Sequence, residues 1–474
     1  MQRFLNGFLL VLGLMLPWGG NARAYSLLTH EQLIDLTWKD SIVPLLLSRY
    51  PNLTEAQLDE ARAYAYGGCV IQDIGYYPFG DLNYSNLTHY VRTGDFVINL
   101  FRNAHNPDEL AFAVGALSHY IGDSIGHPEA TNRAVPIEFP KLRAEYGPDV
   151  NYAEGEHQHV QAEFAFDINE VLHHRVAPIH YLRHIGLGVP LKQLALAFYQ
   201  TYGVGEDFTN RRGRRVNVNA YRFAVRSFIP RIAYAVAVLH RHRTLPDPTT
   251  PDVVELEREA AAVADENNWQ AYRKKAGLGT YLLAGFLKFG QLRMVDIKGP
   301  TAQTEADYAQ SVARSTAALR TMLARFTPPD KRLPHSADLA TGPPQTHLAV
   351  VNTADKNLAG HTGAAAEGPV DVHHPLPNRD LDTGKVVQPG GYSLTDSTYA
   401  HLLHLLTRQP NEPIPPGIKV DIEAYYADPN APITTKKNPQ LWAQVQADLA
   451  TLGAMPTSAE PEPFLTYDNG GDKK

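Results

Sequence analysis

Apolar residues recur every three or four positions over much of the chain, and this spacing is typical of amphipathic helices. A clear case follows Asn106 and Pro107, which are favourable residues for the start of a helix. Its apolar positions are Leu110, Phe112, Ala113, Ala116, Leu117 and Tyr120. Thr54 and Gln57 have the spacing of a capping box. The alternation typical of strands is scarce, so the pattern predicts an all-α fold.

Helical periodicity also marks the second half of the chain. Further helices are predicted at 218–240, 252–276, 305–326, 395–408 and 439–452. Pro230 should split the first of these, because proline cannot donate a backbone hydrogen bond inside a helix. Thr304 and Asn438 are predicted helix starts. Between 328 and 389 the periodicity fades and Pro, Gly, Thr, Ala and His accumulate.

The first 24 residues differ from the rest. A positive charge at Arg3 precedes an apolar run over 4–16, and Ala22-Arg23-Ala24 has the small-x-small pattern of a cleavage site. The run is shorter than the roughly 20 residues of a membrane-spanning helix. We therefore expect a signal peptide that is cleaved after Ala24, and a secreted or periplasmic mature protein that begins at Tyr25. An uncleaved membrane anchor is the alternative.

Composition limits the choice of partners. The formal net charge is −7, and loss of the signal peptide with its two arginines makes it −9. A mildly acidic chain has no overall attraction to nucleic-acid backbones. Cys69 is the one cysteine, so no intrachain disulfide can form. No stable protein partner is predicted.

These patterns divide the chain as follows. We predict a signal peptide at 1–24, a catalytic domain at 25–245, a helical extension at 246–330, a Pro/Gly-rich linker at 331–394, a C-terminal helical region at 395–455 and a disordered tail at 456–474.

Candidate metal ligands are concentrated in the first 170 positions. They are His30, Asp73, His89, His119, Asp123, His127, His159 and Glu163. His119 and Asp123 are four residues apart, as are His159 and Glu163, so each pair lies on one face of its helix. Imidazole and carboxylate groups are ligands that zinc accepts. A single pair of this kind is weak evidence, because such pairs also occur on ordinary helix surfaces.

The order of these residues resembles the zinc-dependent phospholipase C family, which shares an all-helical bundle with single-strand-specific zinc nucleases. The pattern runs His30, Asp73, His89, His119-x-x-x-Asp123, His127, His159-x-x-x-Glu163. His127 follows Asp123 by only four residues, without the Gln-Pro turn usual in the bacterial phospholipases and the nucleases. This spacing is closest to the catalytic domain of glycosylphosphatidylinositol-specific phospholipase D. The resemblance covers about residues 25–171, and the additional C-terminal helices lie beyond it.

The resemblance implies a cluster of three zinc ions. Asp73, His89, His119 and Asp123 would hold the first, and His127, His159 and Glu163 the second. His30, Asp123 and the free amino group and carbonyl of Tyr25 would hold the third. Cleavage after Ala24 would therefore create a ligand.

A zinc cluster of this kind implies phosphodiester hydrolysis by metal-activated water, with Asp73 as the candidate base and ligand. The expected substrate is a phospholipid or glycophospholipid at a membrane surface, cut as by a phospholipase C or D. The alternatives are a single-strand nuclease, which the net charge disfavours, and a zinc-binding module without activity. Residues 122–126 also match the letters Gly-x-Ser-x-Gly, but the helical pattern before Ser124 lacks the strand that a nucleophile elbow needs.

Overall fold

The computed structural model describes residues 27–77, 80–206, 208, 218–240, 250–289, 299–327 and 376–459. Helices make up most of this part of the chain. Only two isolated β-bridges, Arg379 with Val386 and Ile414 with Thr457, occur among these residues. The predicted all-α fold is confirmed. The predicted signal peptide, Tyr25, residues 331–375 and most of the predicted tail lie outside the described residues.

The first half of the chain contains short and long helices joined by compact turns. They are α2 (Leu27–Thr37), η1 (Trp38–Ile42), α3 (Val43–Arg49), α4 (Glu55–Gly68), η2 (Gln72–Gly75), α5 (Leu82–Tyr90), α6 (Thr93–Arg102), α7 (Pro107–Gly126), η3 (His127–Thr131), α8 (Asn132–Glu138), α9 (Pro140–Tyr146), α10 (Tyr152–Leu172), α11 (Ile179–Ile185) and α12 (Leu191–Tyr202).

The second half of the chain also consists of short and long helices. Its helices are α13 (Val218–Phe223), η4 (Ala224–Phe228), α14 (Ile229–His240), α15 (Pro251–Glu266), α16 (Trp269–Tyr272), α17 (Leu278–Phe289), α18 (Ala302–Phe326), α20 (Ser393–Thr407), α21 (Pro416–Tyr425), η8 (Thr434–Lys437) and α22 (Pro439–Ala454). None of the described helices is both long enough and apolar enough to cross a bilayer.

Several predicted boundaries agree with the structure. The capping box at Thr54 is present, and Asn438 caps α22. Around Pro230 the helical stretch divides into α13, a wide π-turn at η4 and α14, as the missing proline donor requires. One start is corrected: α18 begins at Ala302 with Thr301 as its cap, and Thr304 closes the capping box.

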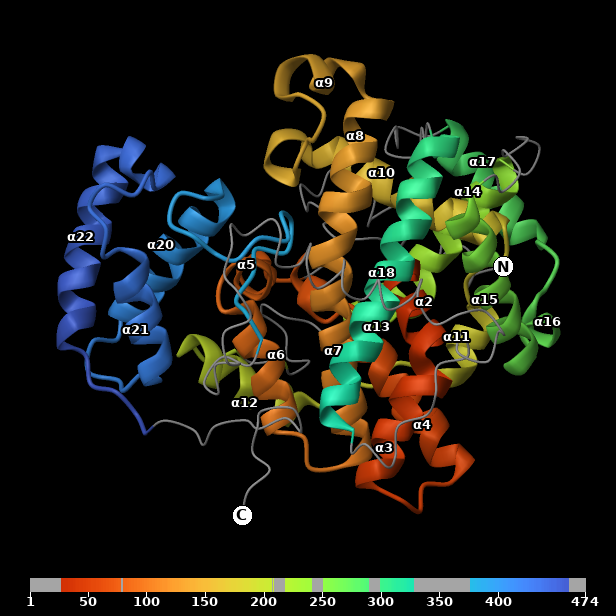
Figure 1. Cartoon of the computed structure of the whole chain (residues 1–474), viewed down its shortest axis with the longest axis horizontal. Helices are drawn as coiled ribbons and strands as arrows, with labels where there is room; N and C mark the ends of the chain where they lie inside the picture. Colours follow the sequence, from red (N-terminus) through yellow and green to blue (C-terminus); the bar gives the residue numbers. More distant parts are fainter. Residues whose placement is uncertain are drawn as a thin grey trace, which may run out of the picture.

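Helix α7 lies at the centre of the molecule and packs against α2, α3, α4, α6 and α18 (Figure 1). Its approach to α4 is very close. A Cβ atom on Gly68 would lie 2.1 Å from the Phe112 carbonyl oxygen, and one on Gly115 would lie 2.2 Å from that of Ala65. Glycine at both positions therefore lets the two backbones touch.

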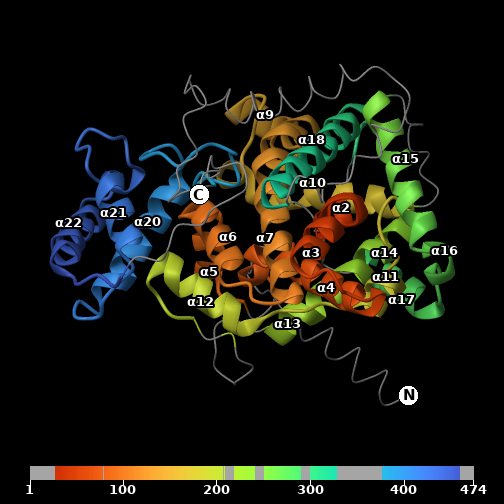
Figure 2. The same ribbon diagram turned by 60° about the horizontal axis from the view of Figure 1, so that its bottom comes forward.

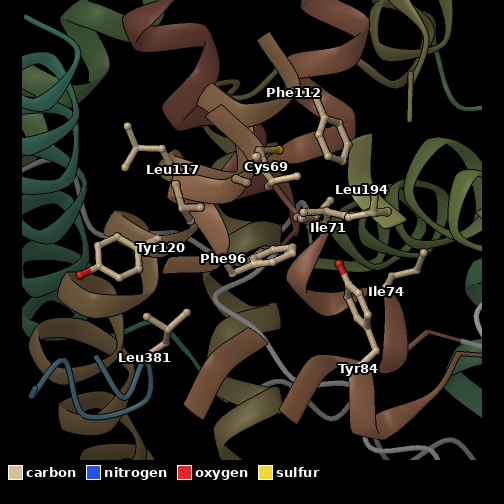
Figure 3. Close-up of a cluster of buried hydrophobic side chains, with 14 of the residues drawn as sticks. Cys69, Ile71, Ile74, Tyr84, Phe96, Phe112, Leu117, Tyr120, Leu194 and Leu381 are labelled. Atoms are coloured by element: carbon tan, nitrogen blue, oxygen red, sulfur yellow. The ribbon is translucent and has the colours of Figure 1, made fainter. Parts of the chain in front are cut away.

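The α20–α22 helices lie on one side of α7 and the α14–α17 helices on the other (Figures 1 and 2). Helix α20 packs against α5, and α21 packs against α12. Figure 3 shows that Leu381, which precedes α20, shares a buried hydrophobic cluster with Leu117 and Tyr120 of α7. The C-terminal region is thus joined to the first half by its core.

Candidate metal centre

Eight side chains converge in the interior from six separate elements, and each is at most 3% exposed. They are His30 on α2, Asp73 on η2, His89 on α5, His119 and Asp123 on α7, His127 at the start of η3, and His159 and Glu163 on α10. These are eight of the nine predicted metal ligands. The ninth, Tyr25, lies outside the described residues.

The ligand atoms form three groups in which every atom lies within 4.8 Å of the others. The groups are His30 with His119 and Asp123, Asp73 with His89 and His119, and His127 with His159 and Glu163. The first two groups share His119, and we call their five residues the Asp73 side. The third group is called the His127 side.

Asp123, a member of the Asp73 side, also reaches the His127 side. Its Oδ1 is 3.2 Å from His30 Nε2 and 3.8 Å from His127 Nε2. Its Oδ2 is 3.0 Å from His119 Nε2 and 3.5 Å from His89 Nε2. One carboxylate is therefore in reach of four imidazoles, as a ligand shared between two ions would be.

On the Asp73 side, the backbone fixes which histidine nitrogens carry protons. His89 Nδ1 lies 2.7 Å from the Ser85 carbonyl oxygen, and His119 Nδ1 lies 3.0 Å from that of Cys69. A carbonyl only accepts, so each Nδ1 donates and each neutral ring has its lone pair on Nε2. The close packing of α4 on α7 brings the Cys69 carbonyl to this place.

The two lone pairs then face each other, because the Nε2 atoms of His89 and His119 are 3.3 Å apart. They also face Asp73, whose Oδ1 is 3.3 Å from His89 Nε2 and 3.9 Å from His119 Nε2. If both rings are neutral, these three acceptor atoms have no proton between them and repel one another. A cation in their midst removes this repulsion.

The His127 side combines one helical pair, His159 and Glu163 on α10, with His127 at the end of α7. His159 Nε2 and His127 Nε2 lie 2.9 Å and 3.3 Å from the same Glu163 oxygen, Oε1. The two rings meet edge to face, with centroids 5.1 Å apart. His127 follows α7 directly, so its four-residue step from Asp123 keeps it on the same face of the helix.

Charges in the site oppose the effect of burial. Burial alone would lower the pKa of His89, but Asp123 and Asp73 outweigh it and raise that pKa to about 10. Burial would raise the pKa of Asp123, yet His119, His127 and His30 hold it well below its usual range. Burial raises the pKa of Asp73 in spite of its histidine neighbours. The carboxylates thus favour a second proton on His89 in the metal-free site, and a metal ion bound at Nε2 would take the place of that proton.

The donor set fits zinc. Both carboxylate oxygens of Asp73 and of Asp123 are buried and accept no regular hydrogen bond from the residues that the structure describes. Buried carboxylates need a charged partner. Imidazole nitrogens and carboxylate oxygens in groups of three or four are a usual zinc environment. Each group could therefore hold one ion.

Ser124 lies inside α7 and is buried, so no strand precedes it. A strained strand-to-helix turn is what exposes the serine of a nucleophile elbow. The Gly-x-Ser-x-Gly letters are therefore part of an ordinary helix.

Sequence reasoning missed one residue at the site. Asp382 Oδ1 lies 3.5 Å from His127 Nδ1, on the side of the ring that faces away from Glu163. Its pKa is held below the usual range, because the charge of His127 outweighs burial. Asp382 falls in the predicted linker 331–394, and the only sequence signal for it is the acidic pair Asp380 and Asp382 just before Thr383-Gly384.

The all-helical fold and the eight buried side chains agree with the result of comparing the sequence with models of known protein families. Residues 29–205 match the family model of the zinc dependent phospholipase C family. The match confirms the resemblance to that family seen in the sequence. Comparisons with curated proteins and with solved structures give no match.

Proposed function

We propose that this protein is a secreted or periplasmic zinc-dependent phosphodiesterase that hydrolyses phospholipids or glycophospholipids. The observation that carries the proposal is the convergence of eight buried histidine and carboxylate side chains inside the family-matched region. Groups of this kind serve few purposes other than binding metal ions. The family match supports a phospholipid as the substrate class.

In this proposal the Asp73 side holds two zinc ions and the His127 side holds one. Zinc at such a site neutralises charge on a phosphodiester and lowers the pKa of bound water. Asp123 keeps the two sides at a fixed separation, since it reaches histidines of both. The elements around the site are packed, which fixes the ligands before the substrate arrives.

Asp73 is the proposed proton acceptor. Burial raises its pKa in the metal-free site, and neither of its buried oxygens accepts a regular hydrogen bond from the described residues, so the carboxylate is available as a ligand and as a proton acceptor. In the reaction, the oxygen of water bonds to phosphorus and one phosphorus–oxygen ester bond breaks. One proton of the water passes to Asp73, the departing alkoxide takes up a proton from solvent, and Asp73 then returns its proton to solvent. Breakage on the glycerol side is a phospholipase C reaction, and breakage on the headgroup side is a phospholipase D reaction.

The test is zinc analysis of the purified mature protein together with three hydrolysis assays. Phosphatidylcholine, a phosphatidylinositol glycan and single-stranded DNA are compared under the same conditions. We expect bound zinc and hydrolysis of one or both lipids. Detection of diacylglycerol or of phosphatidate then assigns the bond that is cut.

The other outcomes point to the alternatives. Hydrolysis of DNA alone would make the protein a nuclease and overturn the lipid proposal. Bound zinc without hydrolysis of any of the three substrates would favour a zinc-binding module. A protein that binds no zinc would contradict the assignment of the site.

A further inference from the structure

Asp382 approaches the metal centre from a part of the chain outside the family match. It is 3% exposed, and it lies in a segment, residues 376–392, that precedes α20. Its Oδ1 is 3.5 Å from His127 Nδ1, while Nε2 of the same ring faces Glu163. The imidazole of His127 is thus placed between two carboxylates.

The orientation of the Asp382 carboxylate is fixed from several elements. Its Oδ2 accepts hydrogen bonds from the hydroxyls of Tyr90, at 2.9 Å, and Tyr392, at 2.8 Å. Its backbone carbonyl accepts one from Asn132 Nδ2, at 2.9 Å. With Oδ2 taken up by two donors, Oδ1 remains directed at His127. A surface carboxylate that met this histidine by chance would not be held in this way.

The backbone of the segment is also attached to the site. The Leu381 amide donates to the carbonyl of His89, at 3.1 Å. The Arg379 amide donates to Thr93 Oγ1, and that hydroxyl donates to the Arg379 carbonyl. Gly384 has a φ of +67°, and a Cβ there would lie 2.2 Å from the Ser124 carbonyl oxygen at the end of α7. Only glycine allows the turn to approach α7 so closely.

We propose that Asp382 is a positioning residue for His127, and that residues 376–392 are therefore part of the metal centre. The inference rests on the proposed function, because it assumes that His127 binds zinc. Asp382 Oδ1 is the carboxylate oxygen that faces Nδ1, at the 3.5 Å of an ion pair, and a proton on Nδ1 leaves the Nε2 lone pair directed at the space beside Glu163. A carboxylate in this role fixes the tautomer of a ligating histidine and makes it a stronger donor. His89 and His119 have backbone carbonyls in the same role, so His127 has the one charged acceptor among these three.

The test compares Asp382→Asn with Asp380→Asn. The asparagine at 382 has nearly the same shape but is neutral: its amide oxygen can still accept from His127 Nδ1, without the negative charge, and its NH2 group then meets the Tyr90 and Tyr392 hydroxyls that donated to Oδ2. Asp380 is a matched control: it is also buried and lies in the same turn, and its partners are Thr395 Oγ1 and the Thr383 amide. Zinc affinity is measured by competition with a chelator, and the sites are also loaded with Co²⁺ for visible absorption spectra.

We expect Asp382→Asn to bind one of its zinc ions about 10- to 100-fold more weakly, the usual effect of losing such a partner. Its cobalt spectrum should change, and the other ions should bind as before. Asp380→Asn should bind every ion with the parent affinity. If Asp382→Asn does not fold, Tyr392→Phe, which removes one donor to Oδ2, should show a smaller loss at the same ion.

Parent-like zinc affinity and an unchanged cobalt spectrum in Asp382→Asn would overturn the inference while leaving the proposed function intact. An equal loss in both aspartate variants, with equally lowered stability of the metal-free protein, would show a structural role only. A parent protein without zinc would overturn the proposed function itself.

Discussion

The two sides of the metal centre are supported in different ways. On the Asp73 side, His89 and His119 are oriented by backbone carbonyls of Ser85 and Cys69, which belong to the family-matched region. On the His127 side, His127 Nδ1 faces the carboxylate of Asp382, which follows about 250 residues later. The first arrangement depends on helix packing alone, whereas the second depends on a distant segment that must dock.

The comparison shows that a segment outside the helical domain can contribute to the metal centre by orienting a ligand, without itself supplying a ligand to the metal. Backbone carbonyls are neutral and present in any helix, so they orient a histidine at little cost. A carboxylate adds charge, and it must be buried and held by donors to be useful. Tyr90 and Tyr392 supply those donors. Each side should therefore respond to its own substitutions.

The largest effect is expected from His119→Ala, because His119 belongs to both groups of the Asp73 side. We expect the variant to lose the zinc ions of that side and to retain about one per chain. Hydrolysis should fall by about three orders of magnitude, since metal ions supply several kcal/mol of charge stabilisation. Metal analysis and lipid hydrolysis measure the two effects. His105→Ala is the control, because His105 is exposed and belongs to none of the three ligand groups. Full zinc content in His119→Ala would contradict the grouping.

A smaller effect is expected from His159→Ala, which removes a ligand of the His127 side only. The variant should lose one ion and keep those of the Asp73 side. We expect activity to fall by about 100-fold, because one of several charge-stabilising ions is lost. His157→Ala is a matched control on the same helix, since His157 is exposed. If His159→Ala also empties the Asp73 side, the two sides are not independent and Asp123 couples them strongly.

The difference between the two sides also explains what the sequence could and could not predict. The pairs His119 with Asp123 and His159 with Glu163 follow from helical spacing, because a local period fixes which residues share a face. The places of His30, Asp73 and His89 came from their order and the family resemblance, since they lie on separate elements. Tyr25 stays a prediction, because it lies outside the described residues.

Asp382 could not be predicted by either route. It lies in a stretch rich in Pro and Gly without helical periodicity, which favours a linker. The composition of a segment indicates its local conformation, but it does not indicate which distant part of the chain the segment packs against. Residues 376–392 dock through hydrogen bonds between residues far apart in the sequence, such as those of the Arg379 backbone with the Thr93 hydroxyl, and no periodicity connects such residues. The same limit applies to Leu381, whose burial depends on the core of the first half.

The smallest effect is expected from Gly122→Ala, which removes no ligand and changes only the packing around His30 on the Asp73 side. A Cβ at this position would lie 2.9 Å from Leu33 Cδ1 and 3.4 Å from His30 Nδ1. The leucine end can shift, so the histidine should move by only a few tenths of an ångström. We expect activity to fall by less than about tenfold, because a displacement of 1 Å costs about 100-fold.

Stability should change in Gly122→Ala by less than about 1 kcal/mol, because alanine favours the helix and this gain offsets part of the crowding. Gly453→Ala in α22 is the control, since a Cβ there meets no atom within 4 Å. Cobalt spectra and hydrolysis rates of the two variants measure the effect on the site. Because the atoms nearest to a Cβ on Gly122 belong to Leu33 and His30, zinc at His127, His159 and Glu163 should bind with unchanged affinity. A loss of affinity there would mean that a shift of His30 is transmitted through Asp123, and the two sides would then act as one unit.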